Sequence, residues 1–283
     1  MSDEQKLDPR IHPYRDDLAA SYLKGKVHAA RFIDGVPCQI GAGFISLKEG
    51  PSYEARQASE LLHGEDFTVL EEHDGWAWGQ SGRDGYVGWL RVEGLSADPE
   101  AATHRVTALR TLLYPAPNVK QPFVDILPMG ALVTVTGEEG AWRQVSGGGW
   151  LYARHLVPLA EIAADPVAVA CRFVGTPYLW GGRTSIGIDC SGLVQVALQA
   201  AGVDCPRDSD QQAASVGTQV SGDGAGFTFQ RGDLVFFPGH VGLMVDGGNL
   251  LHANAFHMEV VVEPLADVLA RAGDQGITAV RRL

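Results

Sequence analysis

The first half of the chain alternates short apolar and polar runs, and one such pattern occurs twice. In each copy a glycine is followed 12 residues later by a tryptophan, Gly64 by Trp76 and Gly130 by Trp142. Each copy then ends in a Gly-Trp-Leu triplet. Short alternating runs that end at glycine turns and tryptophans are typical of small β-barrels. The sequence therefore predicts two such barrels in tandem.

Residues 1–50 precede the first clear copy, and we assign them to the first barrel. The stretch from Asp16 to Leu23 predicts a short helix. Strands are expected around Val27–Phe32 and Ala42–Leu47, where apolar residues cluster between glycines and polar residues.

The second half of the chain has a different pattern. The apolar stretch Val167–Val174 predicts a helix that ends before Gly175. A second helix is predicted after Cys190, because apolar residues recur at helical spacing until Gly202 provides a stop. Three apolar runs between glycine turns then predict consecutive strands, and helices followed by antiparallel strands indicate an α+β fold. These runs are Asp233–Phe237, His240–Val245 and Asn249–Ala253.

Two breaks in the pattern divide the chain into three predicted domains. Pro99 lies in a short alanine-rich, acidic run, which indicates a linker, and Pro158 to Pro166 marks the second boundary. The fold class is therefore multidomain, with two small β-barrels before an α+β domain. The predicted domains are residues 1–98, 99–160 and 161–283.

Composition favours a soluble globular protein. The 283 residues are 45% hydrophobic and 20% charged, which suits two or three globular domains. The 34 acidic and 22 basic residues give a net charge of −12. Such a surface repels phosphate backbones and anionic lipids, so we expect neither nucleic acid nor membrane as a partner. The oligomeric state is left open.

The N-terminal residues and the cysteines indicate the cellular compartment. The N-terminal residues are charged and no apolar h-region follows, so we recognise no secretory signal. No stretch approaches the ~20 apolar residues of a membrane span. Cys38, Cys171, Cys190 and Cys205 show no paired spacing, which fits a reducing environment. We therefore expect a cytoplasmic protein.

Cys190 lies at a predicted helix start, a position that favours a reactive thiol. Asp189 before it belongs to the residue types that cap helix N-termini. The positive end of the helix dipole lowers the pKa of a cysteine there, and the first-turn N–H groups can stabilise an oxyanion. A buried, unreactive cysteine is the common alternative at such a position. Cys171 and Cys205 lack this setting.

Two histidines downstream of Cys190 are predicted to share one face of a hairpin. If Asp246-Gly247-Gly248 forms a three-residue loop, residue 245 faces residue 249 and His252 lies opposite Gly242. His240 then lies on the same face, about 7–8 Å away at Cα. A two-residue loop would instead put the two rings on opposite faces.

A thiol with two imidazoles fits nucleophilic catalysis, because a cysteine nucleophile needs a base and the base needs an orienting group. A zinc site made of the same three residues is the alternative. It lacks a clustered fourth ligand in the sequence, so we expect no metal and no cofactor.

Several sequence blocks resemble the NlpC/P60 family, and the two N-terminal repeats resemble bacterial SH3 domains. The family resemblance implies a papain-like catalytic domain, with order and spacing that agree over roughly residues 165–283. The blocks are Gly175-Thr-Pro-Tyr-Leu-Trp-Gly-Gly182, Asp189-Cys-Ser-Gly-Leu-Val194, Arg231-Gly-Asp-Leu-Val-Phe-Phe237, His240-Val-Gly242 and Leu251-His-Ala253.

The resemblance also implies roles for single residues. Cys190 would be the nucleophile and His240 the general base and then acid. His252 would be the polar third member that orients the His240 ring. Tyr178 matches a family tyrosine near the thiol and would aid the oxyanion site, although a tyrosine that only packs against the helix start is an equal alternative.

Two SH3-like repeats before such a domain resemble the γ-D-glutamyl-diamino acid endopeptidases that recycle murein peptides. The resemblance implies a small substrate, L-Ala-γ-D-Glu-diamino acid, with a free N-terminal amine. Asp189, Ser191 and Tyr86 would bind that ammonium, and Glu54 is a candidate for a further acidic contact. Helix capping by Asp189 and barrel packing by Tyr86 are the structural alternatives. The segment around Arg207 resembles a family segment lining the cleft, and we interpret it as a loop start.

Other functions fit parts of the sequence. The same thiol chemistry could serve an acyltransferase, or an exported amidase that acts on intact peptidoglycan. A wall-anchoring protein could use the repeats for binding while its last domain is inert. The cysteine and two histidines argue against inertness, and the missing export signal argues against contact with the intact wall.

Overall fold

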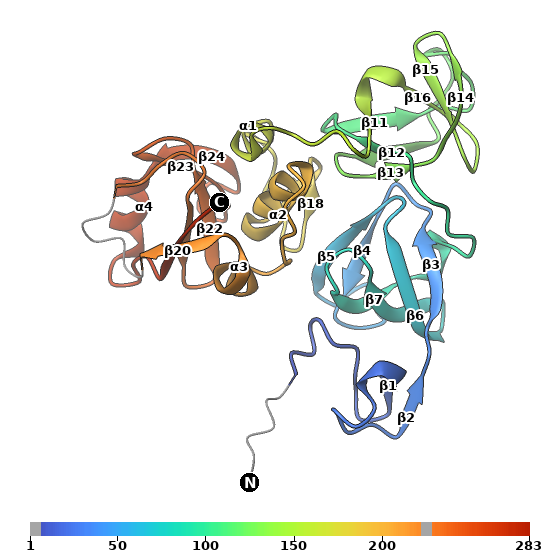
Figure 1. Cartoon of the computed structure of the whole chain (residues 1–283), viewed down its shortest axis with the longest axis horizontal. Helices are drawn as coiled ribbons and strands as arrows, with labels where there is room; N and C mark the ends of the chain where they lie inside the picture. Colours follow the sequence, from blue (N-terminus) through green and yellow to red (C-terminus); the bar gives the residue numbers. More distant parts are fainter. Residues whose placement is uncertain (1–6, 222–227) are drawn as a thin grey trace. The chain divides into compact units, whose positions relative to one another are not determined.

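The computed structural model describes residues 7–221 and 228–283 (Figure 1). The chain forms two compact units. One unit comprises the residues up to Val106 together with Thr111–Leu156, and the other comprises Thr107–Arg110 together with Val157–Leu283. Among the described residues, no helix has both the length and the apolar character that crossing a membrane requires.

The helix predicted over Asp16–Leu23 is wrong. The chain instead forms strand β1 (Leu18–Ala20) and the 3-10 turn η1 (Ser21–Leu23). Strand β1 pairs in parallel with β2 (Arg31–Ile33), which falls partly within the predicted strand. Long-range contacts override local preference here, because the buried side chains of this segment pack against aromatic rings of the first barrel. That cluster contains Leu18, Ala20, Leu23, Trp76, Trp78 and Trp89.

A seven-stranded sheet forms the first barrel, in the order β5-β4-β8-β7-β6-β3-β9. Strand β4 matches the strand predicted near Ala42–Leu47, whereas β3 was not predicted. The core of the barrel is built from side chains on alternate strand positions, including Leu47, Leu61 and Phe67, all fully buried. The strands are β3 (Val36–Ile40), β4 (Phe44–Lys48), β5 (Gln57–Leu62), β6 (Asp66–His73), β7 (Trp76–Ser81), β8 (Val87–Arg91) and β9 (Leu95–Ser96), with the turn η2 (Val92–Gly94).

The second barrel repeats this order of elements. Trp142 begins a strand as Trp76 does, and Gly130, like Gly64, adopts a positive φ. The internal repeat read from the sequence is therefore a structural repeat. Its elements are β10 (His104–Val106), β11 (Arg110–Leu113), β12 (Asp125–Pro128), β13 (Leu132–Val133), β14 (Val135–Glu139), β15 (Trp142–Val145), β16 (Trp150–Tyr152), η3 (Ala153–His155) and β17 (Leu156–Pro158).

The two barrels are joined by hydrogen bonds in which backbone N–H groups are the donors. The Leu132 N–H donates to the His63 carbonyl at 2.8 Å, and the Gly43 N–H donates to Asp125 Oδ2 at 2.8 Å. Gly64 must be glycine, because a Cβ at its position would lie 2.3 Å from the Leu132 carbonyl oxygen.

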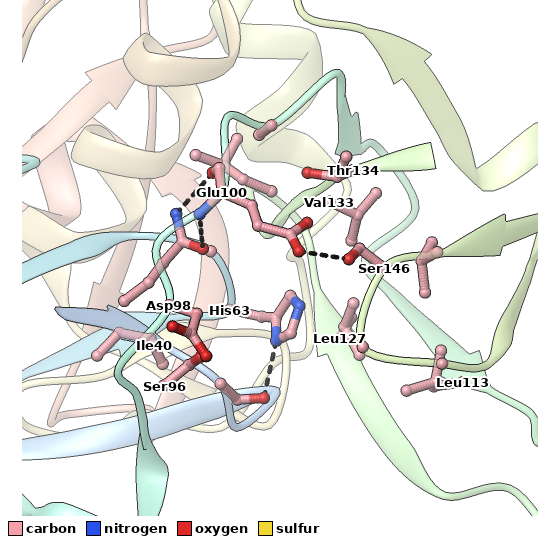
Figure 2. A pocket seen from close by; sticks show the side chains of 18 residues that line it. Ile40, His63, Ser96, Asp98, Glu100, Leu113, Leu127, Val133, Thr134 and Ser146 are labelled. Carbon is pink, nitrogen blue, oxygen red and sulfur yellow. Dashed lines mark hydrogen bonds between the residues drawn. The ribbon is translucent and has the colours of Figure 1, made fainter. Parts of the chain in front are cut away.

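A pocket of about 210 Å³ lies where the two barrels meet, with both apolar and polar side chains in its lining (Figure 2). Some of its polar groups bond to one another or to the backbone. The Ser146 hydroxyl donates to Glu100 Oε1 at 2.6 Å, and His63 Nδ1 lies 2.9 Å from the Gly41 carbonyl.

The second unit combines short helices with a six-stranded sheet in the order β20-β25-β21-β22-β23-β24. Helix α1 ends three residues before the predicted Val174, because the chain turns at Arg172 and buries Phe173. Helix α2 packs on strands β22 and β23 (Figure 1). The described helices are α1 (Pro166–Cys171), α2 (Cys190–Ala200), α3 (Ser209–Ser215) and α4 (Leu265–Ala272).

Three strands of this sheet confirm the predicted ones to within one residue at each end. Strands β20, β24 and β25 were not predicted, since they have few alternating apolar positions. Helix α4 packs on a cluster that includes Val235, Met244 and Leu250. The strands are β20 (Thr218–Ser221), β21 (Leu234–Phe237), β22 (His240–Met244), β23 (Asn249–Asn254), β24 (Glu259–Pro264) and β25 (Ala279–Arg282), beside the hairpin of β18 (Arg183–Thr184) and β19 (Gly187–Ile188).

Candidate active site

Helix α2 begins at Cys190, as its sequence predicts. The Asp189 carboxylate accepts the Gly192 N–H at 2.7 Å, so the predicted N-cap is formed. The helix start also sits tightly against the preceding loop. A Cβ on Gly192 would lie 2.3 Å from the Gly182 carbonyl oxygen, a distance that no side chain tolerates. The glycine two residues after the cysteine therefore allows the helix to begin where it does.

Replacing Gly192 by alanine is expected to lower the free energy of unfolding by about 1–3 kcal/mol, because the backbone must move to relieve the overlap. Urea unfolding measures this change. Gly276→Ala is the matched control, since a Cβ there meets no atom within 4 Å. Equal stability of the two variants would contradict the tight packing described.

Arg207 is a major part of the site that sequence reasoning missed. Its guanidinium donates to Asp189 twice, from Nη1 to Oδ1 at 3.0 Å and from Nη2 to Oδ2 at 2.7 Å. The two side chains are 1% and 10% exposed, so this ion pair is buried. A single arginine in a polar stretch gives no local signal that it will be buried, and for that reason the segment was interpreted as a loop start.

Asp189 and Ser191 both belong to this hydrogen-bond network. Arg207 Nη1 also donates to the Ser191 hydroxyl at 2.9 Å, and that hydroxyl donates to Asp189 Oδ1 at 3.2 Å. The Gly181 N–H donates to Asp189 Oδ2 at 2.8 Å. The Asp189 carboxylate is already paired with the Arg207 guanidinium, so a substrate ammonium bound there would be its second cation.

The two histidines meet as the predicted register requires. Strands β22 and β23 pair Leu243 with Leu251 and Met244 with Leu250, which confirms the three-residue loop. His240 Nε2 lies 2.8 Å from His252 Nδ1. The second ring nitrogen of His240, Nδ1, has no hydrogen-bond partner among residues 7–221 and 228–283. That nitrogen is thus free to accept a proton.

A glutamate, Glu263, lies within hydrogen-bond distance of the second histidine. His252 Nε2 lies 2.8 Å from Glu263 Oε1, on the neighbouring strand β24. Arg271 of helix α4 donates from Nη1 to Glu263 Oε2 at 2.8 Å, and His257 Nε2 lies 3.4 Å from the same oxygen. Glu263 was not predicted, because its place depends on the pairing of β23 with β24, a strand that the sequence pattern did not reveal.

The Cys190 thiol and the His240 imidazole are both neutral at rest. Burial raises the pKa of Cys190 to about 12, and the Asp189 charge adds to this, while the Val241 N–H, Arg207 and the Ser191 N–H oppose it. Burial lowers the pKa of His240 to about 4, and the neighbouring His252 adds to this. The expectation that the helix start lowers the thiol pKa is therefore wrong for the substrate-free site, because desolvation of the thiolate outweighs the helix dipole.

Tyr178 lies close enough to Cys190 for a thiolate there to affect its pKa. Burial raises the pKa of Tyr178 most, and the Asp189 charge or a negative charge at Cys190 raises it further. The phenol therefore stays protonated and can donate a hydrogen bond. Its backbone is fixed by a bond from its N–H to the Met258 carbonyl at 2.9 Å.

Tyr86 and Glu54 belong to the first barrel. The Tyr86 side chain is 6% exposed and lies in the hydrophobic core cluster with Phe67 and Leu90, so it has a packing role. Glu54 is exposed and accepts the Ser52 hydroxyl at 2.7 Å. Contact of either residue with a substrate remains a prediction.

The arrangement suits acyl transfer at a thiol. It offers a nucleophile at a helix start, an unprotonated imidazole, and a second imidazole and a carboxylate behind it. In the part of the chain that the structure describes, no group of three or more His, Cys, Asp or Glu side chains is arranged to hold a metal ion.

Comparison with known proteins identifies both units. Residues 175–272 match the NlpC/P60 family, and residues 47–95 match the bacterial dipeptidyl-peptidase SH3 domain. Two γ-D-glutamyl-L-lysine dipeptidyl-peptidases are similar along most of the chain. The one from Bacillus cereus is 26% identical over 73% of this chain and 70% of its own length. The one from Bacillus subtilis is 29% identical over 79% of this chain and 80% of its own length.

A solved structure shows the same fold. The crystal structure of an NlpC/P60 family protein from Bacillus cereus has a TM-score of 0.75 at 20% sequence identity, and the match covers 87% of this chain and 99% of that one. This likeness shows that the two proteins share a fold. The chain therefore carries an NlpC/P60 cysteine peptidase domain, and a bacterial SH3 domain lies ahead of it in the sequence.

Proposed function

We propose that this peptidase hydrolyses the γ-D-glutamyl–diamino acid bond of small murein peptides that carry a free N-terminal L-alanine. The observation that carries the proposal is the 2.8 Å contact between His240 and His252 beside the Cys190 helix, within a chain similar to γ-D-glutamyl-L-lysine dipeptidyl-peptidases. A dipeptidyl-peptidase removes two residues from the free N-terminus of its substrate. Activity on peptides derived from peptidoglycan is the broader function that these relatives support.

The neutral pair sets the order of proton transfers in the proposed reaction. His240 accepts the Cys190 proton as the sulfur attacks the γ-carbonyl carbon, because the thiol is not ionised beforehand. The oxyanion that forms is stabilised by first-turn N–H groups of α2 and by the Tyr178 hydroxyl. The intermediate then expels the diamino acid amine, which takes the proton from His240, and a thioester remains. Water, deprotonated by His240, hydrolyses the thioester and restores the thiol.

Recognition of the free amine is proposed for Asp189, Ser191 and Tyr86. Arg207 already neutralises Asp189, so net charge at this position contributes little. Hydrogen bonds from the ammonium to the Asp189 carboxylate and the Ser191 hydroxyl would therefore supply the selectivity. An acetylated amine loses two of its donors and its charge, and it adds bulk at a buried site.

Mass spectrometry of reaction products tests both parts of the proposal. L-Ala-γ-D-Glu-L-Lys and its meso-diaminopimelate counterpart are each incubated with the enzyme, with and without N-acetylation, and Cys190→Ala serves as the inactive control. We expect release of the L-Ala-D-Glu dipeptide from the free peptides, and at least about a 10²-fold slower reaction of the acetylated ones. No cleavage of either free peptide would reject the proposed activity.

Two other results would redirect the proposal. Equal cleavage of the acetylated peptides would reject the amine requirement and leave the peptidase activity intact. Strong retention on insoluble murein, with cleavage of the intact polymer but not of free peptides, would favour an enzyme of the cell wall instead.

A further inference from the structure

The described side chains behind Cys190 form a continuous hydrogen-bonded series that ends in a carboxylate. His240 Nε2 lies 2.8 Å from His252 Nδ1, and His252 Nε2 lies 2.8 Å from Glu263 Oε1. The His252 side chain is 2% exposed and the Glu263 side chain 12% exposed, so water competes little for these contacts.

The charge state of Glu263 decides which way the hydrogen bonds point. Burial alone would raise the pKa of Glu263, but hydrogen bonds from Arg271, His252 and His257 outweigh it and lower that pKa to about 2. An ionised carboxylate only accepts hydrogen bonds, so His252 Nε2 must donate. A neutral imidazole has one N–H, and thus His252 Nδ1 is an acceptor.

The same reasoning then applies to the next ring. Since His252 Nδ1 accepts, His240 Nε2 must be the donor in the 2.8 Å contact. A neutral His240 consequently keeps its other nitrogen, Nδ1, unprotonated. Nδ1 is the nitrogen without a hydrogen-bond partner in the described chain, and it is the one that can accept the thiol proton.

We propose that Glu263 is a positioning residue that fixes both imidazoles in the Nε2–H tautomer and so leaves His240 Nδ1 unprotonated for Cys190. This role rests on the proposed peptidase reaction. Arg271 donates to both carboxylate oxygens, and His257 Nε2 lies 3.4 Å from Oε2, so the carboxylate is held in place beside His252. Without the carboxylate, either tautomer of His252 could form, and in one of them the proton on His240 would move to Nδ1 and block the base.

Kinetics of Glu263→Gln test the role of the carboxylate. The glutamine side chain is uncharged and only its oxygen accepts hydrogen bonds, so the hydrogen-bond direction at His252 is no longer fixed, and we expect kcat to fall about 10²-fold with little change in KM. The control is Asp267→Asn, which removes one charge from an exposed position of helix α4 and leaves the series intact. A kcat within twofold of the wild-type value in folded Glu263→Gln would overturn the proposal.

The pH profile adds a readout that packing alone would not move. The Glu263 charge raises the pKa of both His240 and His252, so its loss should move the acidic limb of kcat to lower pH. Arg271 and His257 lower the pKa of His252, and Asp189 raises the pKa of His240. These three groups are unchanged in the variant, so their effects stay the same. An acidic limb at the wild-type pH would contradict the assigned role.

A spectroscopic measurement on the wild-type enzyme needs neither substrate nor a folded variant. Nitrogen-15 NMR of the imidazole rings at neutral pH should show Nε2–H and a bare Nδ1 for both His240 and His252. A proton on Nδ1 of either ring would overturn the proposal even if the peptides are cleaved. Conversely, the expected tautomers without cleavage of any murein peptide would sink the proposed substrate alone.

Discussion

Replacing Arg207 by methionine is expected to lower the free energy of unfolding of the peptidase unit by about 3–5 kcal/mol. Methionine fills much of the same volume but leaves the Asp189 carboxylate buried without its cation. The Arg207 side chain is 1% exposed, so water cannot replace the two hydrogen bonds that the Asp189 carboxylate loses. Urea unfolding at neutral pH measures the change.

Two further variants separate charge from packing. Arg231→Met removes a similar arginine–aspartate pair, with Asp165, but its side chains are 46% and 44% exposed, so about 0–1 kcal/mol is expected. Adding Asp189→Asn to Arg207→Met removes the uncompensated charge and should restore part of the lost stability. If Arg207→Met costs no more than Arg231→Met, the buried pair does not stabilise the fold as described.

Replacing His240 by asparagine is expected to lower kcat/KM for the murein peptide by about 10³-fold and to abolish the acidic limb of the pH profile. In the wild type the limb should lie near pH 4, because burial lowers the pKa of His240 to about 4 and the imidazole loses its basicity only below that pH. Rates between pH 3.5 and 8 measure both effects. His28→Asn, at an exposed position, is the control.

Stability should depend on the same histidine. The folded pKa of His240, about 4, lies below its ordinary value of 6.5, so the unfolded chain binds more protons between these values. Stability is therefore expected to fall as the pH drops from about 6.5 towards 4. His252 shifts in the same direction, owing mainly to burial. His240→Asn should weaken this dependence, and an unchanged slope of unfolding free energy against pH would contradict the assigned pKa.

Features encoded over a few residues were predictable from the sequence. The N-cap at Asp189 and the start of helix α2 at Cys190 follow from residue types and helical spacing. The contact of His240 with His252 followed from a loop of three residues, since loop length fixes hairpin register. The internal repeat and the family blocks depend on the same short-range order.

Features that depend on burial or on distant pairing were not predictable. The stretch Asp16–Leu23 looks helical by itself but becomes a strand because β2 and three tryptophans cover it. Glu263 reaches His252 only through the pairing of β23 with β24. Even the direction of the Cys190 pKa shift required the structure, since the helix start and the desolvated surroundings act in opposite directions.

The sequence by itself therefore determined the family resemblance, the repeat, the helix start and the histidine register, because each depends on residue types within short local segments. The tertiary structure alone decided that Arg207 is buried on Asp189, that Glu263 ends the histidine series, and that the resting thiol is neutral. Each of these depends on solvent exclusion and charge at short range between segments far apart in sequence. Periodicity describes which face of an element is buried, but it does not state which charges meet there.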